Sequence, residues 1–393
     1  MKEVVIVDYL RTAFSRSRPR QPERDVFNCF RADDLISVVY EEIIKRTKVR
    51  PEEIGDCLTG CAFPIGENWM YGGRTVSLMA KLPLSVPACC FDRQCASSQT
   101  TIQYGAMEIM TGFSDIVLAG GMEHMTHHPM GVGVTPSPKV GQHPSGFEAG
   151  VAMNMGLTAE KLFKETSDHF SREDMDKWSL RSHELAAKAI DEGFFKDEIL
   201  PMEATLADGT KKVIDVDQAI RRGGTMEKMA SLKGAFTRKG NITAGNSSPL
   251  NAGAAGMMLM SKEKAAEYNL KPLAKIKSMA VAAVDPSVMG KGPVPASKLA
   301  LERAGLEVKD IDFWEINEAF AIVALNCIHE LGIDPEKVNV KGAAVAIGHP
   351  LGASGSRLTG TLARILHLEN GKYGLANLCV GGGQGTAVVI ERI

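Results

Sequence analysis

The sequence predicts an α/β fold built from a duplicated unit, because two stretches far apart in the chain share one layout. In the first, an apolar strand at 86–91 leads through a loop to a helix, and a second strand follows at 116–119. In the second, a strand at 338–340 leads through a glycine-rich loop to a helix, and a strand follows at 375–379. This order is typical of β-α-β units on a mostly parallel sheet.

The helix in each unit has its apolar residues on one face. They lie at Ile102, Ala106, Ile109 and Met110 in the first helix, and at Leu358, Leu362, Ile365 and Leu366 in the second. This spacing of i, i+4, i+7 and i+8 builds one buried stripe. We expect Gly112 and Gly371 to end the two helices.

The chain between the two units has a different character. From about residue 124 to 243 it is richer in Met, His, Pro and charge, and strand patterns fade. Helices are expected at 158–165 and 172–192, the second with Ser171 and Asp174 in a capping arrangement. We interpret this region as a functional excursion from the first unit.

Length and composition indicate a globular protein with more than one core. The chain has 393 residues, beyond the roughly 250–300 at which one core stops growing. Its apolar share is 44% and its charged share 23%. A net charge of −2, with both signs interspersed, argues against a nucleic-acid-binding surface. No apolar run approaches the ~18 residues of a membrane span, and the chain moves at once into a strand at Val4–Val7, so we expect a cytoplasmic protein.

Eight cysteines in a chain of this length do not indicate a disulfide framework. Cys57 and Cys61 are four residues apart, with no nearby Cys or His pair to complete a zinc site. The cluster of His124, His127 and His128 suggests a metal site, but no carboxylate spacing supports one. We therefore expect no metal.

Cys95 is the first candidate for chemistry, because it lies between a predicted strand and a predicted helix. A thiol at a helix N-terminus faces unpaired backbone N–H groups and the positive end of the helix dipole, and both favour thiolate. The same N–H groups can receive a developing oxyanion. A buried structural cysteine is the alternative.

The second candidate is His349, in the glycine-rich segment 348–355. Pro350 restricts His349 to extended backbone angles, and a histidine held in this way can take a proton from a thiol. A glycine-rich turn before a helix could instead hold phosphate. This segment lacks the Lys-Ser/Thr of a P-loop, so the histidine favours catalysis.

Two more motifs stand near strand ends. Cys379 is followed by three glycines at 381–383, which is not how a core thiol is usually presented. Asn317 opens the segment 317–321 after the apolar-acidic stretch 313–316. Taken alone, the Asn317 segment would be the capped start of a helix.

Together these four motifs resemble those of the thiolases, and the resemblance covers almost the whole chain. Further matching segments are 4–8, 11–12, 120–125, 156–160, 243–248 and 391–393. The segments 285–290 and 292–298 look especially like the fatty-acid β-oxidation branch, that is, bacterial 3-ketoacyl-CoA thiolases.

The resemblance implies a five-layer αβαβα core made of duplicated β-α-β-α-β units. In this scheme residues 1–123 and 244–272 form the N-terminal core. Residues 124–243 form an inserted loop domain for CoA and substrate binding and for oligomer contacts, and residues 273–393 form the C-terminal core.

The resemblance also implies a reaction. Thiolases cleave a 3-ketoacyl-CoA with free CoA through an acyl-cysteine, and the reverse is a Claisen condensation. Cys95 corresponds to the acyl-accepting nucleophile, His349 to the group that activates it and donates to an oxyanion, and Cys379 to the proton donor and acceptor. Asn317 matches the residue that holds an oxyanion-binding water, and Gly381 a backbone oxyanion donor.

The CoA-binding residues carried over by motif lie mostly in the middle of the chain. Arg221, a better match than Arg222, corresponds to the contact with the nucleotide end of CoA, and Ser248 to a serine on the pantetheine arm. The apolar lining would be Met155, Phe236, Met289 and Phe320. Asn154 departs from the family, which has His or Met there, and could alter substrate preference. CoA and acyl-CoA are substrates in this scheme, and no cofactor is expected.

Other functions and partners stay open at this point. Within the family, a short-chain acetoacetyl-CoA thiolase working in the condensing direction is the alternative. A ketoacyl synthase would pair Cys with two His, or with His and Asn, and Cys379 speaks against it. A non-catalytic CoA- or lipid-binding subunit would not need all four motifs. The resemblance implies a homodimer or homotetramer, with or without a hydratase/dehydrogenase subunit.

Overall fold

The computed structural model describes residues 1–393, and ten of its strands form one sheet, nine of them along a single hydrogen-bonded path with β5 paired to β1 beside it. The strands are β1 (Val4–Thr12), β2 (Asp56–Gly60), β3 (Ala88–Phe91), β4 (Ile116–His124), β5 (Ile199–Leu200), β8 (Ala252–Ser261), β9 (Ala274–Ala283), β10 (Phe313–Ile316), β11 (Tyr373–Val380) and β12 (Gln384–Glu391). A separate hairpin consists of β6 (Met202–Thr205) and β7 (Lys211–Ile214).

The path consists of two halves, and the second repeats the strand order of the first without a counterpart of β3. The first half runs β3-β2-β4-β8-β1 and the second β10-β11-β12-β9. They meet edge to edge, where Val5 and Ile6 of β1 pair with Lys275 and Ala274 of β9. In the second half β9, β10, β11 and β12 take the places that β1, β2, β4 and β8 have in the first. The duplication predicted from the sequence is therefore confirmed at the level of topology.

The sheet is mixed, so the expectation of a mostly parallel sheet is wrong. The pairs β2–β3, β2–β4 and β10–β11 are parallel, but β4–β8, β1–β8, β11–β12 and β12–β9 are antiparallel. The reason in the second half is a tight turn: Gly382 and Gly383 have positive φ and let β11 fold straight back as β12.

The central strands are buried on both faces, and this creates a layered molecule. Successive residues of β1 alternate between two cores: Val5 and Val7 pack in one, and Val4 and Ile6 in the other. The same alternation in β12 places Val388 in the second core and Ala387 in a third. A strand covered on both faces reads as a continuous apolar run, as Val4–Val7 at the start of β1 do in the sequence.

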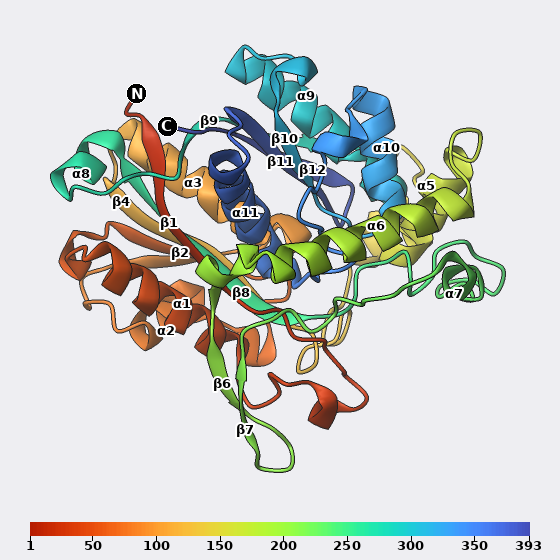
Figure 1. Ribbon diagram of the computed structural model, residues 1–393, viewed down its shortest axis with the longest axis horizontal. Coiled ribbons are helices and arrows are strands. Elements are labelled where there is room, and N and C mark those ends of the chain that lie inside the picture. The colour runs from red at the N-terminus through yellow and green to blue at the C-terminus, as the bar shows by residue number, and fades with distance from the viewer.

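Helices fill the three spaces that these faces define (Figure 1). α1 (Ala32–Thr47) and α2 (Arg74–Met79) cover the outer face of the first half, and α9 (Pro293–Ala304) and α10 (Ala321–Leu331) that of the second. α3 (Ser97–Thr111) and α11 (Ser354–Leu368) lie between the halves and share one core with both. The layers are therefore helix, sheet, helix, sheet, helix, as the resemblance implies.

The predicted C-terminal end is right for one central helix and wrong for the other. Gly112 takes the left-handed conformation at φ 79° and ends α3 as expected. α11 ends at Leu368, three residues before Gly371, because Asn370 already takes the left-handed conformation at φ 56°. The strand predicted at 338–340 is reduced to a single bridge from Val338 to Trp314, since Asn339 also has positive φ.

The inserted region between β4 and β8 combines helices and short strands with long loops. It contains α4 (Ala149–Ala152), α5 (Met155–Glu165), α6 (Arg172–Asp191) and α7 (Met226–Ala230), with β5 to β7 between α6 and α7. Beyond the inserted region, the short helix α8 (Lys262–Glu267) follows β8. The capping box of α6 forms as predicted, because the Ser171 N–H donates to Asp174 Oδ2 and the Asp174 N–H to Ser171 Oγ. No helix of the chain has the length and apolarity that crossing a membrane requires.

The close contact of α3 and α11 leads to a first prediction. A Cβ on Gly355 would lie 2.3 Å from the backbone N of Gln99, so Gly355→Ala forces two packed helices apart. We expect the free energy of unfolding to fall by about 1–3 kcal/mol, measured by urea denaturation. Gly150→Ala is the control, since nothing lies within 4 Å of its Cβ position. Equal stability of the two variants would contradict the packing described.

Candidate active site

Cys95 lies at the N-terminal end of the central layer. It belongs to a 3-10 turn at Gln94–Ala96 that continues directly into α3, so its position at a helix N-terminus is confirmed. Only 8% of Cys95 is exposed. Its side chain packs in a small cluster with Ala62, Met125 and Leu351. The cluster brings together loops from both halves of the chain.

Burial opposes the thiolate that a helix N-terminus favours. It raises the pKa of Cys95 to about 12, although the backbone N–H of Gly381 hydrogen-bonds the sulfur and pulls this pKa down. The expectation that the local setting favours thiolate is therefore wrong for the substrate-free chain. The buried sulfur loses more hydration than one backbone donor returns.

His349 is held by a hydrogen bond at each polar position. Its backbone N–H donates to Asn251 Oδ1 at 2.8 Å, and its Nδ1 lies 2.6 Å from Ser354 Oγ. Because Ser354 Oγ donates its own hydrogen to Pro350 O, it accepts from Nδ1–H. The proton then sits on Nδ1, and Nε2 keeps its lone pair.

The charge state of His349 follows from its surroundings. Burial, together with the positive charge of Arg357, lowers the pKa of His349 to about 3. The imidazole is therefore neutral at physiological pH, and in the substrate-free chain its Nε2 lone pair accepts a hydrogen bond from the Asn317 amide. This is the state in which a histidine can accept a proton from a thiol.

Asn317 joins the site from the end of β10. Its Nδ2 lies 3.2 Å from His349 Nε2, so these two sequence-predicted residues touch. Asn317 does not cap a helix, because α10 begins four residues later at Ala321. Its Oδ1 is buried and has no hydrogen-bond partner in the protein. An unpaired buried acceptor beside a histidine is a suitable partner for a bound water.

Cys379 completes the group from the end of β11. It is fully buried and lies close enough to Cys95 for the two thiols to affect each other. Burial, and then the charge of Cys95, raises the pKa of Cys379 well above its usual value. Gly381 follows at the turn into β12, and a Cβ there would lie 3.5 Å from Met155 Sδ. The structure therefore brings the candidate catalytic residues of the sequence into one neighbourhood.

Most of the predicted apolar lining lies together beside this group. The Phe236 ring covers Gly156 and meets the Phe320 ring edge to face at 5.9 Å between centroids. Phe320 and Met289 are buried in the outer core of the second half, and Met155 packs against that core. Phe236 is 41% exposed, which suits the wall of an open cleft better than a core position.

Asn154 and Ser248 are committed to the backbone. Asn154 is exposed and caps α5, since its Oδ1 accepts from the N–H groups of Gly156 and Leu157. Capping is thus the role that the structure gives to the residue in which this chain departs from the family. Ser248 Oγ donates to Ala319 O at 3.1 Å, and the preceding residue, Ser247, pairs with Phe320.

Arg221 and Arg222 differ in their partners. Both line a cleft of about 340 Å³ beside α6. Arg222 forms a bidentate pair with Asp191 at 2.7 and 2.8 Å. The guanidinium of Arg221 has no such partner, and only its backbone N–H is bonded, to His183 Nδ1. The Arg221 guanidinium is therefore not neutralised by a carboxylate, whereas that of Arg222 is.

The histidine cluster has ordinary hydrogen-bond partners. His124 Nε2 lies 3.1 Å from Phe27 O, and its ring stacks on His127 at 3.8 Å. His127 pairs with Glu67 and Asn28. No group of three or more His, Cys, Asp or Glu side chains is arranged to hold a metal. All eight cysteines are free.

Sequence reasoning missed three residues that shape the site. Ser354 fixes the tautomer of His349, Asn251 holds its backbone, and Glu123 contacts the loops on both sides of Cys95. Ser354 and Glu123 both lie in segments that resemble thiolase motifs, so the sequence offered a reason to name them as candidate site residues. Asn251 gave no signal, because its contact spans 98 residues of chain.

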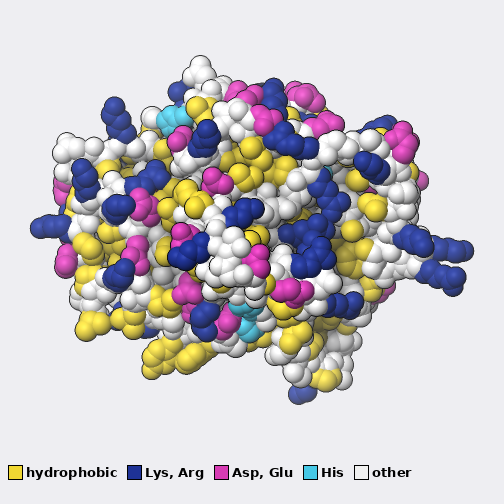
Figure 2. Space-filling view, turned by 60° about the horizontal axis from the view of Figure 1, so that its bottom comes forward, with side chains coloured by type: hydrophobic (Ala, Val, Ile, Leu, Met, Phe, Trp, Pro, Cys, Tyr) yellow, Lys and Arg dark blue, Asp and Glu magenta, His cyan; other side chains and the backbone are white.

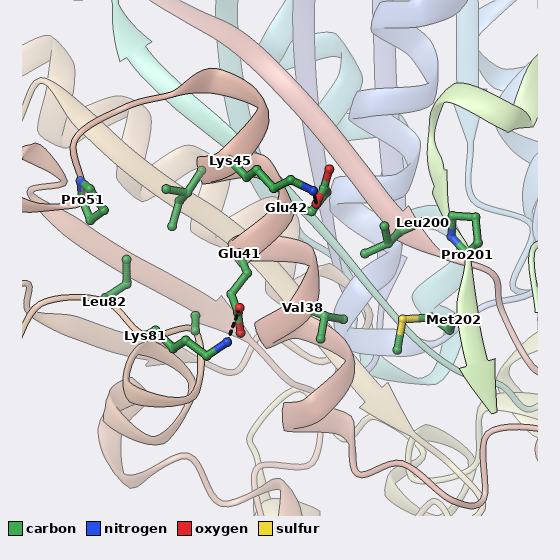
Figure 3. Close-up of a pocket in the computed structure, with 12 residues that line it drawn as sticks. Val38, Glu41, Glu42, Lys45, Pro51, Lys81, Leu82, Leu200, Pro201 and Met202 are labelled. Atoms are coloured by element: carbon green, nitrogen blue, oxygen red, sulfur yellow. Dashed lines mark hydrogen bonds and ion pairs between the residues drawn. The ribbon is translucent and has the colours of Figure 1, made fainter. Parts of the chain in front are cut away.

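A surface hollow larger than the cleft at Arg221 lies elsewhere. It measures about 630 Å³ and lies between α1 and the β5–β6 segment. Figure 3 shows its acidic side chains already paired, Glu41 with Lys81 and Glu42 with Lys45. No candidate catalytic residue lines it, so this hollow is not the candidate active site.

Fold and site together define a class of protein. A buried thiol at a helix N-terminus, with a neutral histidine and a second thiol nearby, fits enzymes that transfer acyl groups through a thioester. Residues 4–263 match the family described as "Thiolase, N-terminal domain", and residues 270–392 the one described as "Thiolase, C-terminal domain". The chain belongs to the thiolase family.

Individual relatives support this assignment along the full length. A "3-ketoacyl-CoA thiolase" of Vibrio vulnificus is 45% identical, with all of both chains covered, and one of Marinobacter nauticus is 43% identical, with 100% of this chain and 99% of the other covered. The crystal structure of human mitochondrial 3-ketoacyl-CoA thiolase has a TM-score of 0.89 at 35% identity. That of the Bacillus anthracis acetyl-CoA acetyltransferase has 0.86 at 36%. Each structural match covers 100% of this chain and 99% of the other.

The hydrogen-bond chain from Ser354 to His349 leads to a second prediction. Ser354→Ala removes the acceptor of Nδ1–H, so the proton can move to Nε2 and block it as a base. We expect the rate of Cys95 acylation to fall roughly 10- to 100-fold, part of the ~10²–10⁴-fold that a positioned base contributes. Rapid-quench measurement of acyl-enzyme formation checks this.

A matched control lies two residues further on. Ser356 is equally buried, but its Oγ has no partner. Ser356→Ala should therefore leave acylation nearly unchanged. If the two variants lose rate equally, Ser354 does not set the tautomer.

Proposed function

We propose that this protein cleaves 3-ketoacyl-CoA with free CoA, giving acetyl-CoA and a shortened acyl-CoA. The observation that carries the proposal is the meeting of Cys95, His349, Asn317 and Cys379 at the ends of α3, β10 and β11. Each supplies a step that the others cannot. The family membership and the names of the full-length relatives agree with it.

The first half of the reaction forms an acyl-cysteine. The Cys95 thiol gives its proton to His349 Nε2, and its sulfur attacks the C3 ketone of the substrate. The C2–C3 bond then breaks, and the shortened acyl group stays on Cys95 as a thioester. The departing acetyl-CoA leaves as an enolate, which takes a proton at C2 from Cys379.

The second half returns the enzyme to its starting state. Cys379, now a thiolate, takes the proton of the incoming CoA thiol. The CoA sulfur attacks the acyl-Cys95 carbonyl, and Cys95 leaves and regains its proton from His349. Two oxyanions form along the way. A water on Asn317, with His349, would stabilise the enolate, and the backbone N–H groups of Cys95 and Gly381 the tetrahedral intermediate.

The pKa values of the resting site fit this cycle. With the pKa of Cys95 raised to about 12 and that of His349 lowered to about 3, the free enzyme holds a neutral thiol beside a neutral imidazole. Proton transfer between them is then unfavourable until a ketone carbonyl is present to accept the sulfur. The cost of burial thus keeps Cys95 protonated between turnovers.

Arginines at the rim of the site suit the phosphates of CoA. Arg16, Arg18, Arg24 and Arg221 lie near one another, and their charges, after burial, lower the pKa of Arg16. None of the four forms an ion pair with a carboxylate, in contrast to Arg222. Figure 2, which turns the lower side of Figure 1 toward the viewer, shows Lys and Arg side chains gathered near the middle of that face. Unpaired guanidinium groups favour a polyanion.

The segment that carries Arg16 and Arg18 borders the candidate site. The Ser17 N–H donates to Leu250 O, and Leu250 packs against the cluster around Cys95. The Arg18 N–H donates to Thr126 Oγ1, next to Met125 of the same cluster. Ligand phosphates bound at these arginines would therefore sit at the edge of the site that holds the thiol.

The length of the acyl chain separates this proposal from its nearest alternative, a short-chain acetoacetyl-CoA thiolase. The likeness to the Bacillus acetyl-CoA acetyltransferase favours keeping that alternative. Comparison of kcat/KM for acetoacetyl-CoA and for longer 3-ketoacyl-CoA substrates decides between them. A preference for longer chains supports the β-oxidation role in fatty-acid metabolism.

We further propose a cytoplasmic homo-oligomer. The edge strand β3 has no second neighbour in the sheet, and its Cys89 is exposed. Exposed aromatic residues lie beside it, because Tyr104 packs on Phe91 and the Tyr71 turn contacts β3. An open strand edge next to exposed apolar rings suits pairing with a second copy. Light scattering decides between monomer, dimer and tetramer, and pull-down shows whether a hydratase/dehydrogenase subunit joins.

The division of labour between the two thiols gives a third prediction. Cys379→Ala should still allow Cys95 to be acylated, but it removes the group that protonates the acetyl-CoA carbon. We expect exchange of deuterium from D₂O into the acetyl-CoA methyl group to fall at least ~10²-fold. Cys327→Ala, another fully buried thiol, is the control. Normal exchange in Cys379→Ala would remove Cys379 from the mechanism.

The contrast between the two neighbouring arginines gives a fourth prediction. Arg221→Ala should raise KM for CoA about threefold to tenfold, which corresponds to roughly 0.6–1.4 kcal/mol, with kcat little changed. Arg222→Ala should change KM less than Arg221→Ala, because Asp191 already neutralises Arg222. Steady-state kinetics with CoA as the varied substrate checks both. A larger effect at Arg222 would show that CoA is held differently.

A further inference from the structure

Glu123, at the end of β4, is a buried carboxylate without a cation. It is fully buried and forms no ion pair. All its partners are neutral donors. Oε2 accepts from the N–H groups of Ala62 at 2.9 Å and Gly352 at 3.0 Å. Oε1 accepts from the Cys61 thiol at 3.4 Å and the Asn68 amide at 3.5 Å.

These contacts tie together the two loops that enclose Cys95. Ala62 lies just after β2, in the first half of the chain, and Gly352 lies in the loop that carries His349, in the second half. The side chains of Ala62 and Leu351 both pack on Cys95. One carboxylate oxygen therefore fixes the walls of the thiol's pocket relative to each other.

The loop at Gly352 has no freedom to adjust on its own. A Cβ at Gly352 would lie 2.2 Å from Met122 O and 2.8 Å from the Cys61 Cα. The backbone of the His349 loop is thus pressed against β4 and the segment after β2. Without an acceptor at position 123, the Ala62 and Gly352 N–H groups would be buried and unpaired, which destabilises this arrangement of the two loops.

No positive charge near Glu123 offsets its own. The titratable groups around it are the thiols of Cys61 and Cys95, and the charge of Asp92 raises the pKa of both thiols. His124, the next residue in the chain, has its Nε2 hydrogen-bonded to Phe27 O instead. Burial accordingly raises the pKa of Glu123 to about 7, and its negative charge in turn raises the pKa of Cys95. As pH rises through about 7, Glu123 ionises and Cys95 becomes harder to ionise.

We propose that Glu123 is a positioning residue of the active site, which holds the loop after β2 and the His349 loop in the arrangement that sets His349 against Cys95. In this role Glu123 contacts neither the substrate nor the reacting atoms. Its effect on turnover rests on the proposed thiolase function. Its effect on the Cys95 thiol does not, and this separates the two in an experiment.

Two variants separate the positioning role of the Glu123 side chain from the effect of its negative charge. Glu123→Gln and Glu123→Ala both remove the negative charge, but only Gln keeps an oxygen that accepts from Ala62 and Gly352. Its amide nitrogen would take the place of Oε1 beside Asn68, and the Asn68 amide can turn to present Oδ1, which has no partner in the wild type, so the variant should fold. Glu108→Gln is the control, since Glu108 lies at the far end of α3 and burial raises its pKa to about 7 as well.

Two measurements follow: kcat for thiolysis, and the pH midpoint of Cys95 alkylation by iodoacetamide, read on the Cys95 peptide by mass spectrometry. We expect kcat to fall about 10²-fold in Glu123→Ala, the effect of a displaced catalytic group, and to recover to within about fivefold of wild type in Glu123→Gln. The alkylation midpoint should move to lower pH in both variants and stay in place in Glu108→Gln.

The contrary results are equally clear. Equal kcat in the two Glu123 variants, whether normal or lost, overturns the positioning role. An unchanged midpoint in both overturns the charge effect. If Glu123→Ala does not fold, Glu123→Asp replaces it, because the shorter side chain cannot reach both loops. If the wild type cleaves no 3-ketoacyl-CoA, the proposed function fails, while the alkylation midpoints still test Glu123.

Discussion

The close crossing of α3 and α11 in the central layer determines the rest of the molecule. Gly355 allows the first turns of the two helices to touch, and Gln99 of α3 then reaches across to hydrogen-bond Ala376 and Thr386 of the second half. Each helix begins just after a candidate catalytic residue, Cys95 in one case and His349 in the other. Because the helix starts meet, residues 254 positions apart share one site.

Burial gives this site its electrostatic character. Between two sheets there is little water to stabilise charge, so thiols and imidazole are all held in their neutral forms. Local features such as a helix N-terminus act in the opposite direction, but they are weaker than the loss of hydration. The molecule therefore holds a site whose reactivity depends on what binds in it, and Glu123 adds to this by placing a further negative charge behind Cys95.

Much of this could be predicted from the sequence, for physical reasons that particular elements illustrate. α3 and α11 carry apolar stripes that pack into one core, and β1 opens with the apolar run Val4–Val7 because both its faces are covered. Three details were not accessible. The antiparallel return of β12 depends on glycine turn geometry, the end of α11 on Asn370 leaving helical angles, and the pKa of Cys95 on neighbours from distant loops. Likewise, the sequence shows that Ser354 and Glu123 are present, but it does not show their hydrogen-bond partners, because these are set by the tertiary fold.

The central claim is that Cys95, and not the nearby Cys379, carries the acyl group. The most direct test mixes the protein with a 3-ketoacyl-CoA in the absence of free CoA, quenches it in acid and maps the product by peptide mass spectrometry. The account predicts one shortened acyl group per chain, on the Cys95 peptide, together with one equivalent of acetyl-CoA. An acyl group on Cys379, or acetyl-CoA release without any acylated cysteine, would contradict it.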